Sequence, residues 1–309
     1  MKLLYALLYA VWWLLSLLPM RVHYVLSDAL FLLVYHVLRY RRPLVRRHLA
    51  DCFPEKTAEE RLEIERGFYH WFGDYIAETV KLLTISHSNL KRRMVFKGSE
   101  LIDEAIESGQ SCAIYLGHYC NWEWVTSLPL WVTPKAQCGQ IYHVLENKEF
   151  DRLFLRLRQR LGAVSIPMAE TLRRLATYRQ QNQPVVIGYI SDQVPFWNNI
   201  HHWCPFLNHD TPVFTNGEKI IRKMNNAVFY VDMERPARGK YVVTFKLITL
   251  TPGELEENAI TRQFFAMLEE TIRREPHLYL WSHNRWKRTH EEFDRLFKVV
   301  NGKVLPREE

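Results

Sequence analysis

From residue 94 onward, short apolar runs alternate with segments in which apolar residues recur at helical spacing. The runs are rich in β-branched and aromatic residues, which is typical of buried strands. The predicted strands lie near Met94–Lys97, at Cys112–Leu116, near Gln137–Tyr142, at Val164–Ile166 and at Pro184–Ile190, and the predicted helices at Glu100–Ser108, Lys148–Leu161 and Ala169–Asn182. This order predicts an α/β fold with a mostly parallel central sheet flanked by helices.

The pattern changes after residue 193. Val194–Pro212 predicts a long aromatic loop, and loops of this length are uncommon unless they are functional. Ala227–Met233 and Tyr241–Leu250 predict two strands joined by a turn that contains proline and glycine. Glu254–Arg274 predicts a further helix.

The first forty residues are the most apolar part of the chain. Leu3–Met20 carries no charge and as a helix would extend about 27 Å, close to the thickness of a bilayer core. It lacks the small-residue cleavage site of a signal peptide, so we expect a retained membrane helix, with a buried core helix as the alternative. Val22–Leu38 contains His23, Asp28 and His36, which favours an interfacial or core helix. The arginines that follow place the rest of the chain on the cytoplasmic side.

Between these regions, Pro54 ends one predicted helix and the next begins with a capping box formed by Thr57 and Glu60. That helix should extend to about Leu83. Its aromatic residues recur at helical spacing, which indicates packing.

Composition narrows the possible partners. The chain has 309 residues, 48% of them hydrophobic, so it can bury one large core. The net charge of +7 favours an anionic partner: nucleic acid, anionic lipid or an acidic protein. The five cysteines and the histidines at 201, 202 and 209 match no common zinc spacing, and the cysteines form no disulfide pattern. We therefore interpret the cysteines as reduced cytosolic thiols and expect no metal.

One turn concentrates reactive side chains. Gly117 ends the strand Cys112–Leu116, so His118 follows the carboxyl end of a strand, where α/β sheets bind ligands. Asn121 is a plausible N-cap for a helix that opens at Trp122 and holds Glu123 in its first turn. Only this geometry would let the Glu123 carboxylate meet the His118 imidazole and orient it as a general base. The alternative is a surface turn, in which Cys120 is a small filler.

Two other residues are candidates from their positions. Arg158 lies on the helix before Gly162, where it could bind phosphate or support a carboxylate, or belong to a solvated face. Asp192 follows the strand Pro184–Ile190, where it could be a site residue or a turn residue.

The segment Gly117–Trp124 resembles the H-x4-D/E block of membrane glycerolipid and lipid A acyltransferases, particularly the H-[FY]-x-N-W-E form of late lipid A acyltransferases. Other blocks agree in chain order: Phe53-Pro54-Glu55, Asp192-Gln193, Pro205–Gly217, and Pro276–Lys287, which is close to the family ending P-x-x-Y-x-W-x-H-x-R-[FW]-K. Within Pro205–Gly217, Asp210 departs from the family pattern, in which a small neutral residue is commoner at that position, and this leaves the local contacts with the acceptor open. From Leu3 to Lys287, the chain resembles the lauroyl and myristoyl acyltransferases of lipid A biosynthesis.

This resemblance implies transfer of a fatty acyl chain from acyl carrier protein to a hydroxyl of a lipid A precursor. The place would be the cytoplasmic side of the bacterial inner membrane, within lipopolysaccharide biosynthesis. His118 would be the general base, oriented by Glu123, and the chemistry would require no cofactor. The substrate-binding residues that the resemblance implies are Arg158, Asp192, Arg235, His283 and Arg285.

The resemblance also implies a division of the chain into an N-terminal membrane anchor with an interfacial helix, residues 1–40, and a catalytic domain, residues 41–309. Two alternatives stay open: the same chemistry on another membrane lipid, such as an ornithine lipid, a glycolipid or a mannosylated phosphoinositide, and a non-catalytic membrane scaffold. A nucleic-acid binder is disfavoured because the chain has no recognisable nucleic-acid motif.

Overall fold

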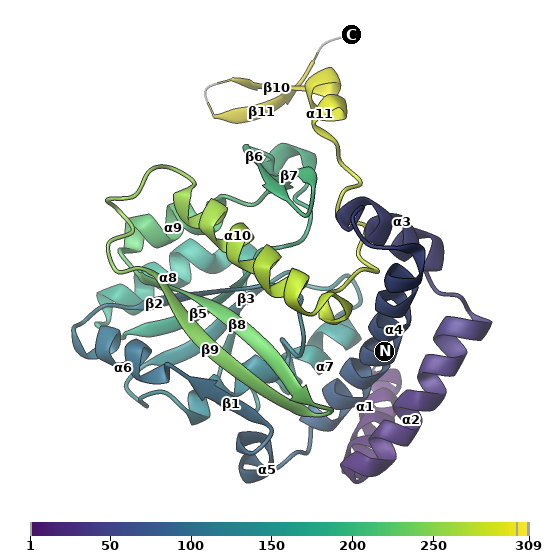
Figure 1. Cartoon of the computed structure of the whole chain (residues 1–309). Coiled ribbons are helices and arrows are strands. Elements are labelled where there is room, and N and C mark those ends of the chain that lie inside the picture. The colour runs from purple at the N-terminus through teal and green to yellow at the C-terminus, as the bar shows by residue number, and fades with distance from the viewer. Residues whose placement is uncertain (1, 301, 308–309) are drawn as a thin grey trace.

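The computed structural model describes residues 2–300 and 302–307 and contains a seven-stranded central sheet in the order β1-β9-β8-β2-β5-β3-β4 (Figure 1). Every neighbouring pair is parallel except β8 and β9, which form an antiparallel hairpin. The strands are β1 Met94–Lys97, β2 Cys112–Leu116, β3 Gln137–Tyr142, β4 Val164–Pro167, β5 Val185–Ile190, β8 Ala227–Ala237 and β9 Lys240–Thr249. The predicted α/β class and mostly parallel sheet are confirmed.

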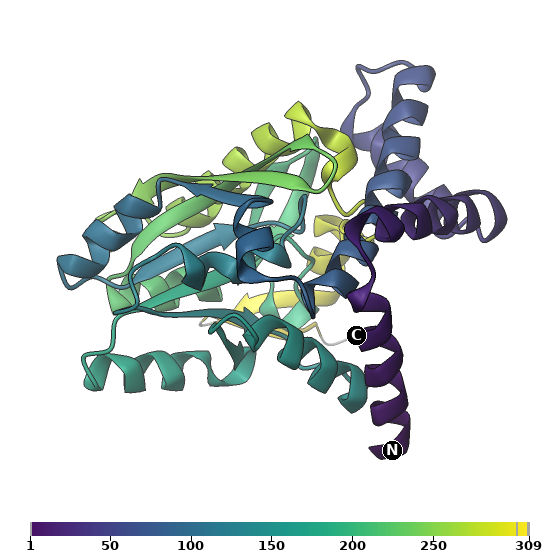
Figure 2. The same cartoon turned by 90° about the horizontal axis from the view of Figure 1, so that it is seen from below.

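Helices cover both faces of this sheet. In Figure 2, α10, in yellow-green, lies on one face, and the teal helices α7 and α8 lie on the other. The helices of this part are α5 His87–Lys91, α6 Ser99–Glu107, α7 Lys148–Gln159, α8 Thr171–Gln180, α9 Asn216–Met224 and α10 Ala259–Arg274. Because β2 and β5 lie inside the sheet and are covered on both faces, their side chains are almost all buried, which explains why they are continuous apolar runs.

The N-terminal helices pack beside the sheet rather than on it (Figure 1). Helix α1, Lys2–Leu17, ends before Pro19, and α2, Met20–Leu32, begins after it and continues as a π-helical turn, Leu33–Val37. The two meet at 115°, because proline cannot continue the hydrogen bonds of α1 but suits the start of α2. Lys81 donates to the carbonyls of Ser16 at 2.7 Å and Leu18 at 2.8 Å and so satisfies the end of α1.

This bend corrects the expected continuous helix over Leu3–Met20. Within residues 2–300 and 302–307, no single helix is long and apolar enough to cross a membrane, although α1 and α2 together pass that test as a bent pair. The N-terminal membrane helix therefore stays a prediction.

Helix α4, Ala58–Leu82, joins the N-terminal helices to the sheet. The predicted capping box is confirmed: the Glu60 amide donates to Thr57 Oγ1 at 3.2 Å, and the Thr57 amide donates to the Glu60 carboxylate at 2.7 Å. Helix α3, Arg42–Cys52, packs against α4 and is held by ion pairs from Arg42 and Arg46 to the buried carboxylate of Glu65. From Ile64 onward, α4 therefore has many buried side chains.

Three local predictions were wrong. The loop predicted over Val194–Pro212 contains a hairpin of β6, His202–Phe206, and β7, His209–Val213, because Leu207 and Asn208 adopt positive φ values that close a two-residue turn. The helix expected from Trp122 is a 3₁₀ helix, Trp124–Leu130, that contains Pro129. Helix α10 begins at Ala259 rather than Glu254. The remaining C-terminal elements are α11 His290–Leu296, β10 Phe297–Val300 and β11 Lys303–Pro306.

Candidate active site

His118 and Asp192 come together at one edge of the sheet. Strands β2 and β5 are parallel neighbours, so the residues two positions beyond each strand lie side by side. One Asp192 oxygen lies 2.6 Å from His118 Nδ1, and the other accepts the His118 backbone N–H at 3.0 Å. These contacts fix the imidazole, with Nδ1 donating to the carboxylate, and leave Nε2 as the proton acceptor of the neutral ring.

The charge environment suits a base. Asp192 is 1% exposed, whereas the His118 side chain is 19% exposed. Burial raises the pKa of Asp192, but the charge and hydrogen bonds of His118 outweigh it, so this pKa lies below its usual range. Asp192 therefore stays ionised and would stabilise the imidazolium that forms when His118 takes up a proton. The amide nitrogen of Gln193 lies 3.1 Å from Nε2, at the place where a substrate hydroxyl would approach.

Glu123 has a different partner from the one expected. Both of its carboxylate oxygens accept from Arg158 on α7, at 2.9 Å from Nε and 2.5 Å from a terminal nitrogen. Cys120 has a positive φ of 56°, which turns the chain so that Glu123 faces α7 while His118 faces β5. The predicted orientation of His118 by Glu123 is thus corrected, since Asp192 occupies that position.

Two aromatic rings connect these pairs. Trp122 lies edge-on to the His118 ring at 5.2 Å and stacks on Tyr75 of α4 at 4.1 Å. The turn is further held by Asn121, whose Oδ1 accepts the Trp124 backbone N–H at 3.1 Å. The two pairs therefore meet at one packed turn, which carries His118 and Glu123.

Cys120 is fully buried in this turn. Burial raises the pKa of its thiol well above the usual range, so the thiolate form is disfavoured. This supports the interpretation of Cys120 as a filler rather than a nucleophile.

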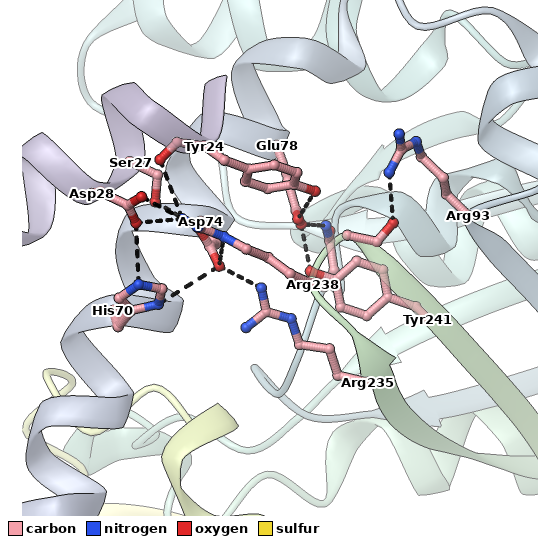
Figure 3. Close-up of polar contacts among 12 residues, drawn as sticks. Tyr24, Ser27, Asp28, His70, Asp74, Glu78, Arg93, Arg235, Arg238 and Tyr241 are labelled. Carbon is pink, nitrogen blue, oxygen red and sulfur yellow. Dashed lines mark hydrogen bonds and ion pairs between the residues drawn. The ribbon is translucent and has the colours of Figure 1, made fainter. Parts of the chain in front are cut away.

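The other predicted binding residues, His283, Arg285 and Arg235, have different partners. His283 accepts the backbone N–H of Val194 at 3.4 Å, and burial lowers its pKa to about 4 although Asp192 opposes the shift. Arg285 is 1% exposed and donates to the Pro212 carbonyl at 2.7 Å, so it holds the β6–β7 hairpin. Arg235 lies in a separate network and donates to Asp74 (Figure 3). In this structure Arg285 is buried and Arg235 is partly buried, and each contacts another part of the protein.

The network around Asp74 includes a group of possible metal ligands, Asp28, His70 and Asp74. Arg238 donates to Asp28 at 2.6 Å and to Asp74 at 2.6 Å, and Arg235 also contacts Asp74 (Figure 3). The guanidinium groups therefore compensate the carboxylates, and the group is an ion-pair network.

Sequence reasoning missed Glu78, which is fully buried and accepts a hydrogen bond from Asn121 at 2.6 Å. The sequence did contain a signal for this residue. Asp74 and Glu78 are four residues apart, on the face of α4 that also carries Trp71, and an acidic group on a buried helix face requires polar partners.

Comparison with known proteins identifies the family of the chain. Residues 2–288 match the family described as bacterial lipid A biosynthesis acyltransferase. The chain is 21% identical over 256 residues to a lipid A biosynthesis palmitoleoyltransferase of Escherichia coli strain K12, and it has the same identity to a lipid A biosynthesis acyltransferase of Shigella flexneri. Each alignment covers 81% of this chain and 80% of the relative. Because the family match spans nearly all of the chain, the protein is an acyltransferase that belongs to the bacterial lipid A biosynthesis acyltransferase family.

Proposed function

We propose that the protein transfers a fatty acyl group from an acyl carrier protein thioester to a hydroxyl of a lipid A precursor. The observation that carries the proposal is the His118–Asp192 pair, in which an ionised carboxylate fixes Nδ1, and Nε2 contacts the side-chain amide of Gln193, which a substrate hydroxyl would replace. Family membership supports the lipid A acceptor. The net charge of +7 suits an acidic carrier protein and a phosphorylated acceptor.

The mechanism is direct transfer. His118 Nε2 takes the proton of the acceptor hydroxyl, whose oxygen attacks the thioester carbonyl carbon and forms a tetrahedral oxyanion. The intermediate collapses with loss of the thiolate, which receives the proton from the imidazolium. Asp192 stabilises this imidazolium through Nδ1. Glu123 and Arg158 act by holding the turn that carries His118.

The N-terminal helices support a membrane location. Many apolar side chains of α1, α2 and the π-helical turn are exposed, whereas soluble proteins rarely expose large apolar patches. They include Leu7, Val11, Trp13, Leu14, Leu17, Val25, Leu32 and Val37. In our proposal, residues 1–40 embed in the inner membrane and residues 41–309 form the catalytic domain on its cytoplasmic side, with Arg39 and Arg47 near anionic headgroups.

The test uses detergent-purified protein, acyl carrier protein loaded with mixed fatty acids and a tetra-acylated lipid A precursor, followed by mass spectrometry of the lipid. We expect the wild type to add one acyl group. The His118→Ala variant should be about 10²- to 10⁴-fold slower, because it lacks the base, and should remain folded.

Retained activity of His118→Ala would remove this residue from the mechanism. An unchanged precursor with the wild type would refute the acceptor assignment. The membrane lipids of a deletion strain would then show whether an ornithine lipid or a glycolipid loses an acyl chain.

A further inference from the structure

Glu78 receives hydrogen bonds from three separate parts of the molecule. Its Oε1 accepts from the Tyr24 hydroxyl at 3.0 Å, and its Oε2 accepts from Asn121 Nδ2 at 2.6 Å and from the Tyr241 hydroxyl. Figure 3 shows Tyr24 and Tyr241 pointing toward the carboxylate. These donors come from α2, from the turn after β2, and from β9.

All three partners donate, which suits an ionised carboxylate because that group only accepts. Burial raises the pKa of Glu78, and the positive charge of Arg235 together with the tyrosine hydroxyls opposes this shift. An apolar side chain would fill the same space without the cost of removing a carboxylate from water. The carboxylate therefore fixes the positions of three side chains, because each of them donates a hydrogen bond to it.

One of those donors belongs to the turn that carries the proposed base. Asn121 is three residues from His118, and the backbone carbonyl of Glu78 also accepts from Trp124 Nε1 at 3.1 Å. Glu78 thus holds Asn121 and Trp124, which flank Trp122, the residue whose ring contacts His118. A shift of Glu78 would move the imidazole relative to Asp192.

The Tyr24 donor belongs to the apolar α2. Its position is closely specified, because a Cβ on Gly239 at the β8–β9 turn would lie 1.7 Å from the Tyr24 hydroxyl, and Gly239 has a positive φ of 71°. One turn further along α2, Ser27 donates to Asp74 at 2.6 Å. Helix α2 therefore packs in one defined position against α4 and the β8–β9 hairpin (Figure 3).

We propose that Glu78 is a positioning residue that couples the packing position of α2 to the geometry of the turn that carries His118. This inference rests on the proposed acyl transfer and adds a route by which the N-terminal helices influence catalysis. Because Glu78 is buried away from solvent and acts through Asn121, its loss should lower kcat and leave KM close to that of the wild type.

The experiment compares Glu78→Gln, Tyr24→Phe and their double variant in the acyl-transfer assay, using the full chain. Glu78→Gln should lower kcat about 10- to 100-fold, because a displacement of the base by a fraction of an ångström slows a positioned reaction. Tyr24→Phe removes one hydrogen bond and should lower kcat about 3- to 10-fold. The double variant should match Glu78→Gln alone, because Tyr24 acts through Glu78.

The matched control is Glu65→Gln, which removes another buried carboxylate from the same helix, one that anchors α3. It should lower thermal stability without a comparable loss of kcat. If Glu78→Gln does not fold, Tyr24→Phe and Tyr241→Phe each remove one donor while the carboxylate stays.

A second readout needs no turnover: the pH dependence of His118 modification by diethyl pyrocarbonate, measured by peptide mass spectrometry. It should shift in Glu78→Gln and Tyr24→Phe but not in Glu65→Gln. This measurement still decides the coupling if the wild type acylates no lipid A precursor. Profiles identical to that of the control, or effects of Tyr24 and Glu78 that multiply in the double variant, would overturn the inference.

Discussion

Two hydrogen-bonded pairs meet at the turn after β2, each made of a buried carboxylate and a nitrogen base, and they differ in what the base can do. In the His118–Asp192 pair, the carboxylate is buried and the imidazole is 19% exposed, with one ring nitrogen directed away from the pair. In the Glu123–Arg158 pair, the carboxylate is also buried, but the guanidinium grips both of its oxygens. The first pair can exchange a proton with a substrate, whereas the second holds two charges in one geometry.

This difference assigns proton transfer to the first pair and stabilisation of the turn to the second. A guanidinium remains protonated throughout the physiological pH range, so Arg158 cannot act as a base. The imidazole of His118 can accept a proton at Nε2, and its contacts with Asp192 hold the pKa of that carboxylate below the usual range. We therefore expect changes in the first pair to affect rate and changes in the second to affect stability.

The largest expected effect tests the supporting pair. Glu123→Gln leaves the Arg158 charge largely buried without its partner, which should lower the free energy of unfolding by about 3–5 kcal/mol. Urea unfolding of the purified protein measures this. The double replacement Glu123→Leu with Arg158→Met should recover most of the loss, because it removes both charges. If Glu123→Gln keeps wild-type stability and loses only kcat, the division between the pairs is wrong.

The next test concerns the orienting carboxylate. Asp192→Asn keeps the size of the side chain but removes the negative charge that stabilises the imidazolium, so kcat should fall about 10²-fold. The melting temperature should change less than in Glu123→Gln. Steady-state kinetics beside a thermal melt would check both. A variant with unchanged kcat would show that Asp192 does not assist His118.

Acidification should sharpen the comparison further. Burial lowers the pKa of His48 and of His283 to about 4, so in the folded protein both stay neutral below pH 6.5, where the unfolded chain takes up protons. Stability is therefore lost as pH falls from about 6.5 to about 4, by about 1.4 kcal/mol per pH unit for each residue.

Urea midpoints at pH 7 and pH 5 would measure this loss. His48→Gln keeps a donor for the Trp281 carbonyl, which His48 Nδ1 contacts at 3.1 Å, and should show a smaller loss than the wild type. An equal loss in both would place the acid sensitivity elsewhere.

Much of this architecture followed from the sequence. The positions of His118 and Asp192 could be predicted because each follows a buried strand, and strand β2 has the predicted bounds. Their contact could not be predicted, because they are 74 residues apart and the neighbours of β2 are β5 and β8 rather than the next strand in the chain. Strand order depends on how all the helices pack, which local periodicity does not encode.

The errors share a physical cause. The expected pairing of Glu123 assumed an ordinary turn, whereas Cys120 adopts a left-handed conformation that non-glycine residues seldom take. Leu207 adopts the same region and turns a predicted loop into a hairpin. The burial of Arg285, whose role in substrate binding stays a prediction, could not be predicted either, because it depends on the tertiary packing around the β6–β7 hairpin. At Cys120 and Leu207 the surrounding structure compensates a local backbone cost that sequence rules treat as prohibitive.

The 115° bend between α1 and α2 has a consequence for how the protein would sit in lipid. A domain carried on one membrane helix can rotate about that helix and tilt with it. Two apolar helices at a wide angle define a plane, and Lys81 fixes their junction through the carbonyls of Ser16 and Leu18. Under the proposed embedding, the domain keeps a single rotational degree of freedom, about the membrane normal. The carboxyl edge of the sheet would then stay at a constant height above the bilayer, and an acceptor lipid diffusing in two dimensions would always meet the catalytic turn from the same side.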